Sequence, residues 1–339
     1  MGKMGISHAA IVGAHPEVEL VAVCDTSALV LAGFQKYSTV TTYSHFQKML
    51  SEEMLDFVVV ATPTSLHYTV VREALNRGIH VFCEKPFSLK TAEGHELVTM
   101  AKRHKLVNQV GYHNHFVGTF WELKNLLALK ILGELTHFTG QAYGPVVTKA
   151  KSRTWRSRRE EGGGCLYDYA SHVLNLVQEI LGRPKTVHGA LLKSIYSHSV
   201  DDAAYVLLSL KNGLSGAVLV NWSDETYRKM STSITVEGKN GKIICDATEI
   251  RIYLKRARPI AELKSGWTIK YITDLALPVN FYLRGEEYSA QIDYFIQHIA
   301  SQSENNYNTF EQAYYTDQVI AKIFETSRIH ETRESTIWG

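Results

Sequence analysis

The sequence predicts a chain of two α/β domains. Residues 1–118 are expected to form a doubly wound parallel sheet, because continuous Val-rich apolar segments alternate there with amphipathic helical segments. Residues 119–339 are expected to form an α+β domain on a largely antiparallel open sheet, because alternating strands are joined there by tight turns. At 339 residues the chain is long enough for each domain to bury a core of its own.

The elements of the first domain follow from apolar periodicity and from the residues that end helices. Gly78 is expected to end one helix, since glycine tolerates the left-handed conformation that often follows a last helical turn. The expected helices cover residues 6–12, 27–37, 66–77 and 91–104, and the expected strands cover residues 19–24, 56–61, 79–83 and 106–110.

The second domain contains two strong hairpin signals. Asn212-Gly213 joins strands predicted over 203–210 and 214–221, and Asn240-Gly241 joins strands predicted over 233–237 and 242–246. Helices are expected over 166–181, 288–299 and 310–329, and the last of them could pack back on the first domain. The helix over 166–181 should stop at Gly182, with Pro184 just beyond it.

Composition excludes several classes of protein. The chain is 45% hydrophobic and 21% charged, which is ordinary for a folded globular protein. A net charge of +2 predicts no attraction to nucleic acid or to a membrane surface. The four cysteines lie far apart without C-x-x-C spacing, so neither a disulfide framework nor a metal site is indicated. With no signal peptide and no apolar run of bilayer length, the sequence favours a cytoplasmic protein.

The N-terminus resembles part of a dinucleotide-binding fingerprint. Gly2-Lys3-Met4-Gly5 precedes a helix and then a strand that ends at Asp25, which lies 25 − 5 = 20 residues after Gly5. That is the expected separation between the last fingerprint glycine and the acid that binds the ribose hydroxyls. The first glycine and the first strand of this Rossmann pattern are missing, so we expect a start upstream of Met1. Asp25 favours NAD(H), whereas Thr26 beside it leaves NADP(H) open.

Glu84-Lys85-Pro86 directly follows the apolar segment 79–83. This places Lys85 at the carboxyl end of a buried parallel strand, where open α/β sheets bind their ligands. A lysine there can donate a hydrogen bond to a substrate hydroxyl and stabilise a developing alkoxide, with Glu84 orienting it. The alternative is a surface lysine paired with its neighbouring glutamate. Pro63 and Thr64, after the preceding strand, should border the nicotinamide side of the same crevice.

A second candidate group of residues follows three consecutive glycines, Gly162 to Gly164. These glycines let the backbone approach a ligand closely. Asp168 and His172 are four residues apart, so on a helix they share one face. A carboxylate beside an imidazole can fix its tautomer and stabilise its protonated form, which suits a general acid or base. The alternative is an ordinary pair on a helix surface.

Taken together, these segments resemble the Gfo/Idh/MocA family of sugar-type dehydrogenases, and the resemblance covers nearly the whole chain. The motifs that match are Gly2-Lys3-Met4-Gly5-Ile6-Ser7-His8, Val23-Cys24-Asp25, Ala61-Thr62-Pro63-Thr64-Ser65-Leu66-His67, Cys83-Glu84-Lys85-Pro86, Val110-Gly111-Tyr112-His113-Asn114-His115-Phe116, Trp155-Arg156 and the segment from Gly162 to His172. His115 stands where relatives often have arginine.

The resemblance implies an active site of Lys85, Asp168 and His172. It also implies a homodimer or homotetramer, because relatives pack sheet to sheet through the C-terminal domain. Together with the glycine spacing, it assigns the NAD or NADP contacts to Gly2, Lys3, Met4, Gly5, Asp25, Thr26, Thr62, Pro63, Thr64, His67, Glu84 and Lys85.

The substrate side is assigned to Tyr112, His113, Asn114, Trp155, Arg156 and Arg228. Arg156 belongs to a basic stretch with Lys149, Lys151, Arg153, Arg158 and Arg159, and Arg228 is followed by Lys229. These basic residues form either a solvated loop surface or a clamp for an anion such as the diphosphate of a nucleotide sugar. His113 and His115 could form a metal pair, but no third ligand is apparent.

The predicted activity is an NAD(P)-dependent oxidoreduction of a hydroxyl-bearing carbon in a sugar, cyclitol or nucleotide sugar. His172 would act as general base and Lys85 would stabilise the alkoxide, or Lys85 would itself accept the proton. Two alternatives from other classes remain: an NAD-dependent glycoside hydrolase that uses transient oxidation, and a dinucleotide-binding regulator without catalysis.

Overall fold

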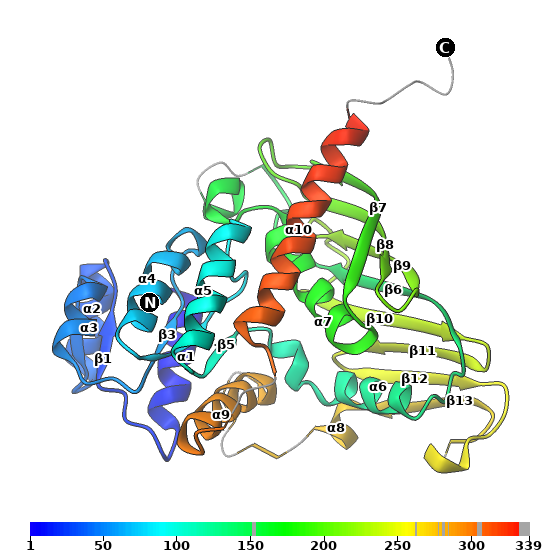
Figure 1. The fold of residues 1–339 in the computed structure, drawn as a ribbon, viewed down its shortest axis with the longest axis horizontal. Coiled ribbons are helices and arrows are strands. Elements are labelled where there is room, and N and C mark those ends of the chain that lie inside the picture. The colour runs from blue at the N-terminus through cyan, green and yellow to red at the C-terminus, as the bar shows by residue number, and fades with distance from the viewer. Residues whose placement is uncertain are drawn as a thin grey trace. The chain divides into compact units, whose positions relative to one another are not determined.

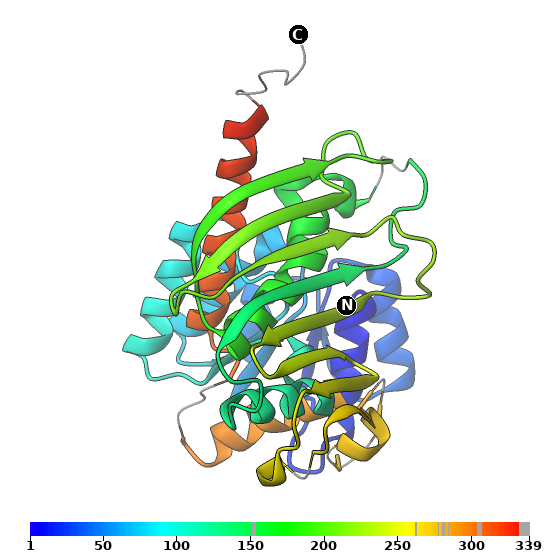
Figure 2. The same ribbon diagram turned by 90° about the vertical axis from the view of Figure 1, so that its right-hand side faces the viewer.

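The computed structural model describes residues 1–150, 154–261, 263–276, 278–279, 282–283, 285–303 and 307–331, with the backbone alone at 260 and 328–331. The chain divides into two compact units. Unit 1 contains Met1–Phe116 and Pro278–Tyr314, and unit 2 contains Val117–Leu277 and the residues from Tyr315 on. Figures 1 and 2 show the elements of both units in two views.

Unit 1 alternates helices and short parallel strands, as the sequence predicts. Its elements are α1 Lys3–Ala14, β1 Ala22–Cys24, α2 Ala28–Tyr37, β2 Thr41–Tyr43, α3 Phe46–Glu52, β3 Phe57–Val60, α4 His67–Asn76, β4 His80–Cys83, α5 Thr91–Arg103, β5 Asn108–Val110 and α9 Glu286–Ala300, with short 3-10 turns at Thr64–Leu66 and His113–Phe116.

The parallel strands of unit 1 lie in two sheets rather than one. β1 pairs with β2, and β3, β4 and β5 form a separate three-stranded sheet, every pairing being parallel. The predicted strand direction is confirmed, but among the described residues no strand pairs β1 with β3. The core of the three-stranded sheet contains fully buried Val81, Cys83 and Val110, with helices α4 and α5 packed beside it.

Unit 1 also includes residues that the sequence interpretation assigned to the second domain. Residues 278–314 belong with residues 1–116, not with residues 119–339. The reason is packing: Ile292 and Phe295 of α9 are fully buried in one cluster with Ile11 and Phe82. Helix α10, Phe310–Glu331, contributes only its first residues to unit 1, where the Phe310 amide donates to Asn108 Oδ1 at 2.8 Å.

Unit 2 is built on one large sheet. Its elements are α6 Gly118–Ala128, β6 Leu135–Tyr143, 3-10 turns at Trp155–Ser157, Arg159–Glu161 and Pro259–Ala261, a π-helical turn at Leu166–Ala170, α7 Ser171–Leu181, β7 Pro184–Lys193, β8 Ala203–Leu210, β9 Ser215–Asn221, β10 Ser231–Gly238, β11 Gly241–Asp246, β12 Glu249–Leu254, β13 Gly266–Tyr271, α8 Ile272–Leu275 and most of α10.

The sheet has eight strands in the order β13-β12-β11-β10-β6-β9-β8-β7. Its pairings are antiparallel except that of β6 with β9, which confirms the prediction of a largely antiparallel sheet. Both predicted hairpins form. In the second, however, Gly241 pairs with Gly238 as a strand residue, so the two turn residues are Lys239 and Asn240.

The two faces of this sheet differ in character. The inner face packs against α6 and α7 with fully buried side chains such as Val218, Ile234 and Ile252 (Figure 1). The outer face is toward the viewer in Figure 2. Large apolar side chains on its strands are exposed. They include Tyr205, Leu207, Tyr253, Trp267, Ile269 and Tyr271. Across the described part of the chain, no helix has both the length and the apolar character needed to cross a membrane.

Candidate functional site

Lys85 lies just beyond the carboxyl end of β4. The backbone of the preceding residue is fixed by the sheet, because the Glu84 amide donates to the Val60 carbonyl at 2.8 Å. On the other side of β4, the Gly111 amide donates to the Cys83 carbonyl at 2.8 Å. Lys85 is half-buried, and its peptide bond to Pro86 is cis. The structure therefore places Lys85 beyond the carboxyl end of a parallel strand, as predicted. Its contact with a ligand stays a prediction.

Glu84 is buried and pairs with a histidine from α1. Its Oε1 lies 2.6 Å from Nε2 of His8, whose side chain is also buried. Its Oε2 accepts the Lys85 amide at 3.3 Å. A Cβ atom at Gly111 would lie only 2.9 Å from Oε1, so glycine is needed there to leave room for the carboxylate. Glu84 thus connects the first helix of unit 1 to the backbone of Lys85.

Sequence reasoning missed the role of His8. The residue lies within the matching segment Gly2 to His8, but 76 positions separate it from Glu84. A histidine on the buried face of an N-terminal helix was the available signal, and it does not by itself indicate a partner. Phe82 packs against the His8 ring at 5.2 Å between centroids, which further fixes the imidazole.

The Glu84–His8 pair makes the stability of the folded protein depend on pH in the acid range. Burial alone would raise its pKa, but the hydrogen bond with His8 and the nearby charges of His8, Lys85 and His113 hold the pKa of Glu84 below its usual value. Because the pKa is lower in the folded state, the stabilisation is present above the unfolded pKa of 4.5 and is lost as pH falls through the folded pKa.

We therefore expect the free energy of unfolding of wild type to approach that of Glu84→Gln as pH falls from about 6 to about 3. Urea unfolding at a series of pH values measures this difference. A difference that stays constant over the whole range would contradict an ionised, stabilising Glu84.

His67, predicted to bind cofactor, is buried and engaged with backbone carbonyls. Nε2 lies 3.1 Å from the Thr62 oxygen, and Nδ1 lies 3.0 Å from the Pro86 oxygen. Burial lowers the pKa of His67, although these carbonyls and the charge of Glu84 act in the opposite direction. His67 therefore holds the segment after β3 against the segment after Lys85. Its contact with a cofactor stays a prediction.

The N-terminal segment contains the glycines that the sequence assigns to the cofactor phosphate. Gly2 precedes the first turn of α1, and no side-chain hydrogen bond caps that turn. Uncapped amides at a helix N-terminus can bind an anion. Lys3 is exposed, Met4 is half-buried, and Gly5 is buried with its Cβ position 3.8 Å from Ala61. These residues fit the phosphate side of a bound dinucleotide.

Asp25 follows β1 directly, and its neighbour Thr26 is exposed. The Asp25 carboxylate accepts the Ser27 amide at 2.7 Å and also contacts the amino group of Met1. Burial opposes ionisation, but these two contacts hold the pKa of Asp25 below its usual value. An ionised acid at the end of this strand fits the ribose hydroxyls of NAD. Beyond β3, Thr62 is half-buried, Pro63 exposed and Thr64 buried.

In unit 2, the glycine run lies against the protein's own backbone and one carboxylate. A Cβ atom at Gly163 would overlap the Arg156 carbonyl, and one at Gly164 would lie 2.7 Å from Oδ1 of Asp201. Gly162 and Gly164 have φ angles of 88° and 105°, in the region that favours glycine. The close approach that the sequence attributed to a ligand is therefore made by Arg156 and Asp201.

Asp168 and His172 lie in the helix that follows this run. The prediction of a helix from Leu166 to Leu181 is confirmed, except that its first turn is π-helical, a form often found at functional sites. Both side chains are buried. The Asp168 carboxylate accepts a hydrogen bond from Nε of Arg156 at 3.1 Å, and the Arg156 guanidinium stacks over the Trp155 ring at 4.5 Å.

Three arginines of the basic stretch ahead of the glycines are paired with acids. Arg156 pairs with Asp168 at 3.1 Å, Arg158 with Glu161 at 2.8 Å, and Arg159 lies 3.6 Å from Asp201. These three arginines are therefore neutralised within the protein, which weakens the hypothesis of an anion clamp. Lys151 and Arg153 lie outside the described residues, and Arg228 is exposed in the loop between β9 and β10.

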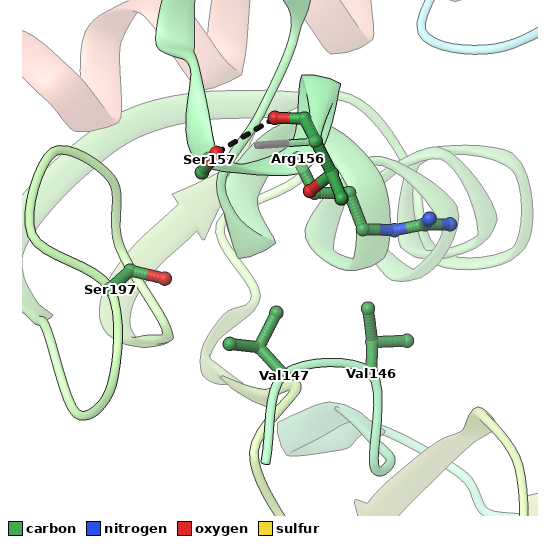
Figure 3. A pocket seen from close by; sticks show the side chains of 6 residues that line it. Val146, Val147, Arg156, Ser157 and Ser197 are labelled. Carbon is green, nitrogen blue, oxygen red and sulfur yellow. Dashed lines mark hydrogen bonds between the residues drawn. The ribbon is translucent and has the colours of Figure 1, made fainter. Parts of the chain in front are cut away.

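A pocket that is partly open to solvent adjoins Arg156. Figure 3 shows Val146 and Val147 on one side, Arg156 and Ser157 on the opposite side, and Ser197 on a separate loop. Thr154 completes the lining, and its carbonyl accepts the Ser157 hydroxyl at 2.7 Å. The lining combines two apolar side chains with hydroxyl groups and one guanidinium.

The remaining candidates lie after β5 in unit 1. Tyr112 and Asn114 are buried, whereas His113 stacks on Tyr288 with ring centroids 4.8 Å apart. His115 packs edge-on against Tyr307 at 5.9 Å. Among the residues that the structure describes, no three His, Cys, Asp or Glu side chains gather as a metal site requires.

A parallel α/β unit with an acid after β1 and a lysine after β4, followed by a sheet unit with a buried Asp and His, is typical of a nicotinamide-dependent oxidoreductase. Comparison with known proteins identifies the family. Residues 1–112 match the model of the oxidoreductase family with an NAD-binding Rossmann fold, and residues 120–244 match the GFO/IDH/MocA C-terminal domain. The chain belongs to the Gfo/Idh/MocA family.

Its relatives include sugar dehydrogenases. The chain is 27% identical to D-glucoside 3-dehydrogenase of Escherichia coli over 255 residues, which are 73% of this chain and 67% of that protein. It is 30% identical to an uncharacterized oxidoreductase of Schizosaccharomyces pombe over 155 residues, 46% of this chain and only 42% of that relative. The fold matches levoglucosan dehydrogenase in complex with NADH, with a TM-score of 0.86 and 18% identity over 97% of this chain and 95% of that one.

Proposed function

We propose that the protein is an NAD(H)-dependent dehydrogenase that acts on a hydroxyl-bearing carbon of a sugar or cyclitol. The observation that supports this most directly is Lys85 at the carboxyl end of β4, with its backbone anchored by the buried Glu84–His8 pair. The names of the relatives, D-glucoside 3-dehydrogenase among them, support a sugar-like substrate. Nucleotide sugars remain within the proposed substrate class. Neutral sugars are favoured over them, because the arginines that could bind a diphosphate are paired with acids.

In the proposed reaction, the imidazole of His172 accepts the proton of the substrate hydroxyl. The ammonium of Lys85 donates a hydrogen bond to the same oxygen and stabilises the negative charge that develops on it. Arg156 holds the Asp168 carboxylate through a hydrogen bond. In the proposed role, Asp168 would orient and charge-balance His172. Bound NAD supplies the acceptor for the hydride. Exchange of the two roles, with Lys85 as proton acceptor, is the alternative within the same chemistry.

A panel of neutral sugars, cyclitols and nucleotide sugars, each offered with NAD and with NADP, tests this function. Appearance of NADH absorbance with at least one polyol is the expected result. A sugar released from a glycoside without net NADH would indicate the hydrolase alternative instead. Cofactor binding without turnover of any substrate would favour the regulator.

Asp25 is expected to determine the preference for NAD. Its carboxylate would accept the two ribose hydroxyls of NAD and repel the 2′-phosphate of NADP. The Asp25→Ser variant should lose about tenfold in kcat/KM with NAD and gain activity with NADP. Steady-state kinetics with both cofactors measure the change. An unaltered ratio of the two kcat/KM values would show that Asp25 does not contact the ribose.

The outer face of the unit 2 sheet is the proposed interface between copies of this chain. The exposed apolar side chains on it, such as Leu207, Trp267 and Ile269, are those that a second copy would cover in a homodimer or homotetramer.

A further inference from the structure

Two consecutive acids, Asp201 and Asp202, lie buried directly before β8. Their exposed fractions are 2% and 0%, which is unusual for aspartates. Neither belongs to a motif that the sequence singled out. Each of them holds a different segment of unit 2.

Asp202 holds the loop after β7. Its Oδ2 accepts the amides of Ile195, Tyr196 and Ser197 at 2.6 to 2.7 Å. Its Oδ1 accepts the Ser197 hydroxyl and the Trp222 indole N–H, both at 2.6 Å. Burial opposes ionisation, but these donors hold the pKa of Asp202 below its usual value. Both oxygens act only as acceptors, so an ionised carboxylate is the group that fits.

Asp201 holds the π-helical turn that contains Asp168. Its Oδ2 accepts the Leu166 amide at 2.8 Å, and its backbone carbonyl accepts the Cys165 amide at 2.8 Å. The Arg159 guanidinium lies 3.6 Å from Oδ1. The carboxylate therefore caps the first turn of the helix that continues to His172.

The two segments held in this way border the same pocket. Ser197, held by Asp202, lines it directly. Arg156, on the opposite side, is hydrogen-bonded to Asp168 of the turn held by Asp201. Because Asp201 and Asp202 are consecutive residues directly before β8, the spacing of these two segments is fixed through a single peptide.

We propose that Asp201 and Asp202 are positioning residues of a polyol-binding pocket. Asp202 fixes the position of Ser197, which lines the pocket and contributes to substrate specificity. Asp201 fixes the orientation of Asp168. This proposal rests on the proposed function for the identity of the ligand. The lining fits a neutral sugar ring: Val146 and Val147 offer an apolar face, while the hydroxyls and Arg156 offer hydrogen bonds.

The test uses isosteric variants of the full-length chain with its cofactor. Asp202→Asn turns one acceptor oxygen into a donor that faces donors whichever way the amide is oriented, so the loop at Ser197 should loosen. We expect KM for the sugar to rise about tenfold while kcat and KM for NAD change less than about threefold.

Asp201→Asn should show the opposite pattern. It removes the negative charge beside the Arg159 guanidinium, which lies 3.6 Å from Oδ1, and leaves the Ser197 loop in place. We therefore expect the turn with Asp168 to shift and kcat to fall about tenfold, with a smaller change in the KM for the sugar. The matched control is Asp246→Asn. The Asp246 carboxylate also accepts hydrogen bonds, from the Thr248 and Glu249 amides and from the Thr248 hydroxyl, but Asp246 does not line the pocket. Its kinetics should stay near wild type.

Amide hydrogen exchange of the three variants keeps the proposal testable without turnover. Asp202→Asn should lose protection at residues 195–197 and Asp201→Asn at residues 165–168, whereas Asp246→Asn should lose it at neither. The same kinetic change in both variants, or an equal loss of protection throughout unit 2, would overturn the positioning roles. A wild-type protein that oxidises no polyol would overturn the proposed function, and the exchange pattern would then still decide the positioning roles.

Discussion

Replacement of Lys85 or His172 by alanine is expected to lower kcat by a factor of about 10² to 10⁴. Lys85→Ala removes the ammonium that would stabilise the alkoxide, and His172→Ala removes the imidazole that would accept the proton. Neither change touches the first turn of α1 or Asp25, so the dissociation constant for NADH should change little. Steady-state kinetics and a fluorescence titration with NADH measure the two quantities separately.

Two matched controls accompany these variants. Lys90→Ala removes a lysine five residues further on, whose ammonium pairs with Glu93 at the surface. His188→Ala removes an exposed histidine of β7 that contacts the Ser209 hydroxyl. Both should retain kcat. If Lys85→Ala or His172→Ala also retained the wild-type kcat, the assignment of catalytic roles would be wrong.

The sequence predicted those parts of the fold that depend on local pattern. Apolar runs and turn residues located β4, the helix after Gly164 and both hairpins of unit 2 to within a few residues. Lys85 could be placed at a strand end for the same reason. The apolar pattern could not predict that α9 packs in unit 1, because the apolar face of α9 at Ile292 and Phe295 would suit the core of either unit.

The candidate site shows the same limit at the scale of single residues. Glu84 and Lys85 were recognisable as neighbours, but the partner of Glu84 lies 76 positions away in His8. Asp201 contacts Leu166 across 35 positions. Charge counting found the arginines ahead of the glycine run but not the acids that neutralise them, since Asp168 and Asp201 reach Arg156 and Arg159 only in the folded chain.

Gly164→Ala is expected to give a large loss of stability in unit 2. At φ of 105° any Cβ atom is strained, and here it would also lie 2.7 Å from Oδ1 of Asp201. The free energy of unfolding should fall by about 2–5 kcal/mol, combining left-handed backbone strain of about 1–2 kcal/mol with overpacking of about 1–3 kcal/mol. Chemical denaturation measures this loss.

Gly213→Ala separates the two causes. Gly213 has a comparable φ of 89°, but nothing lies within 4 Å of its Cβ position, so this variant should show the backbone strain alone, about 1–2 kcal/mol. The excess loss in Gly164→Ala then measures the collision with Asp201. Because Asp201 caps the turn that contains Asp168, that excess should be accompanied by a fall in kcat, which Gly213→Ala should not show. Equal losses of stability in the two variants would mean that the Asp201 carboxylate moves aside freely and does not fix the turn.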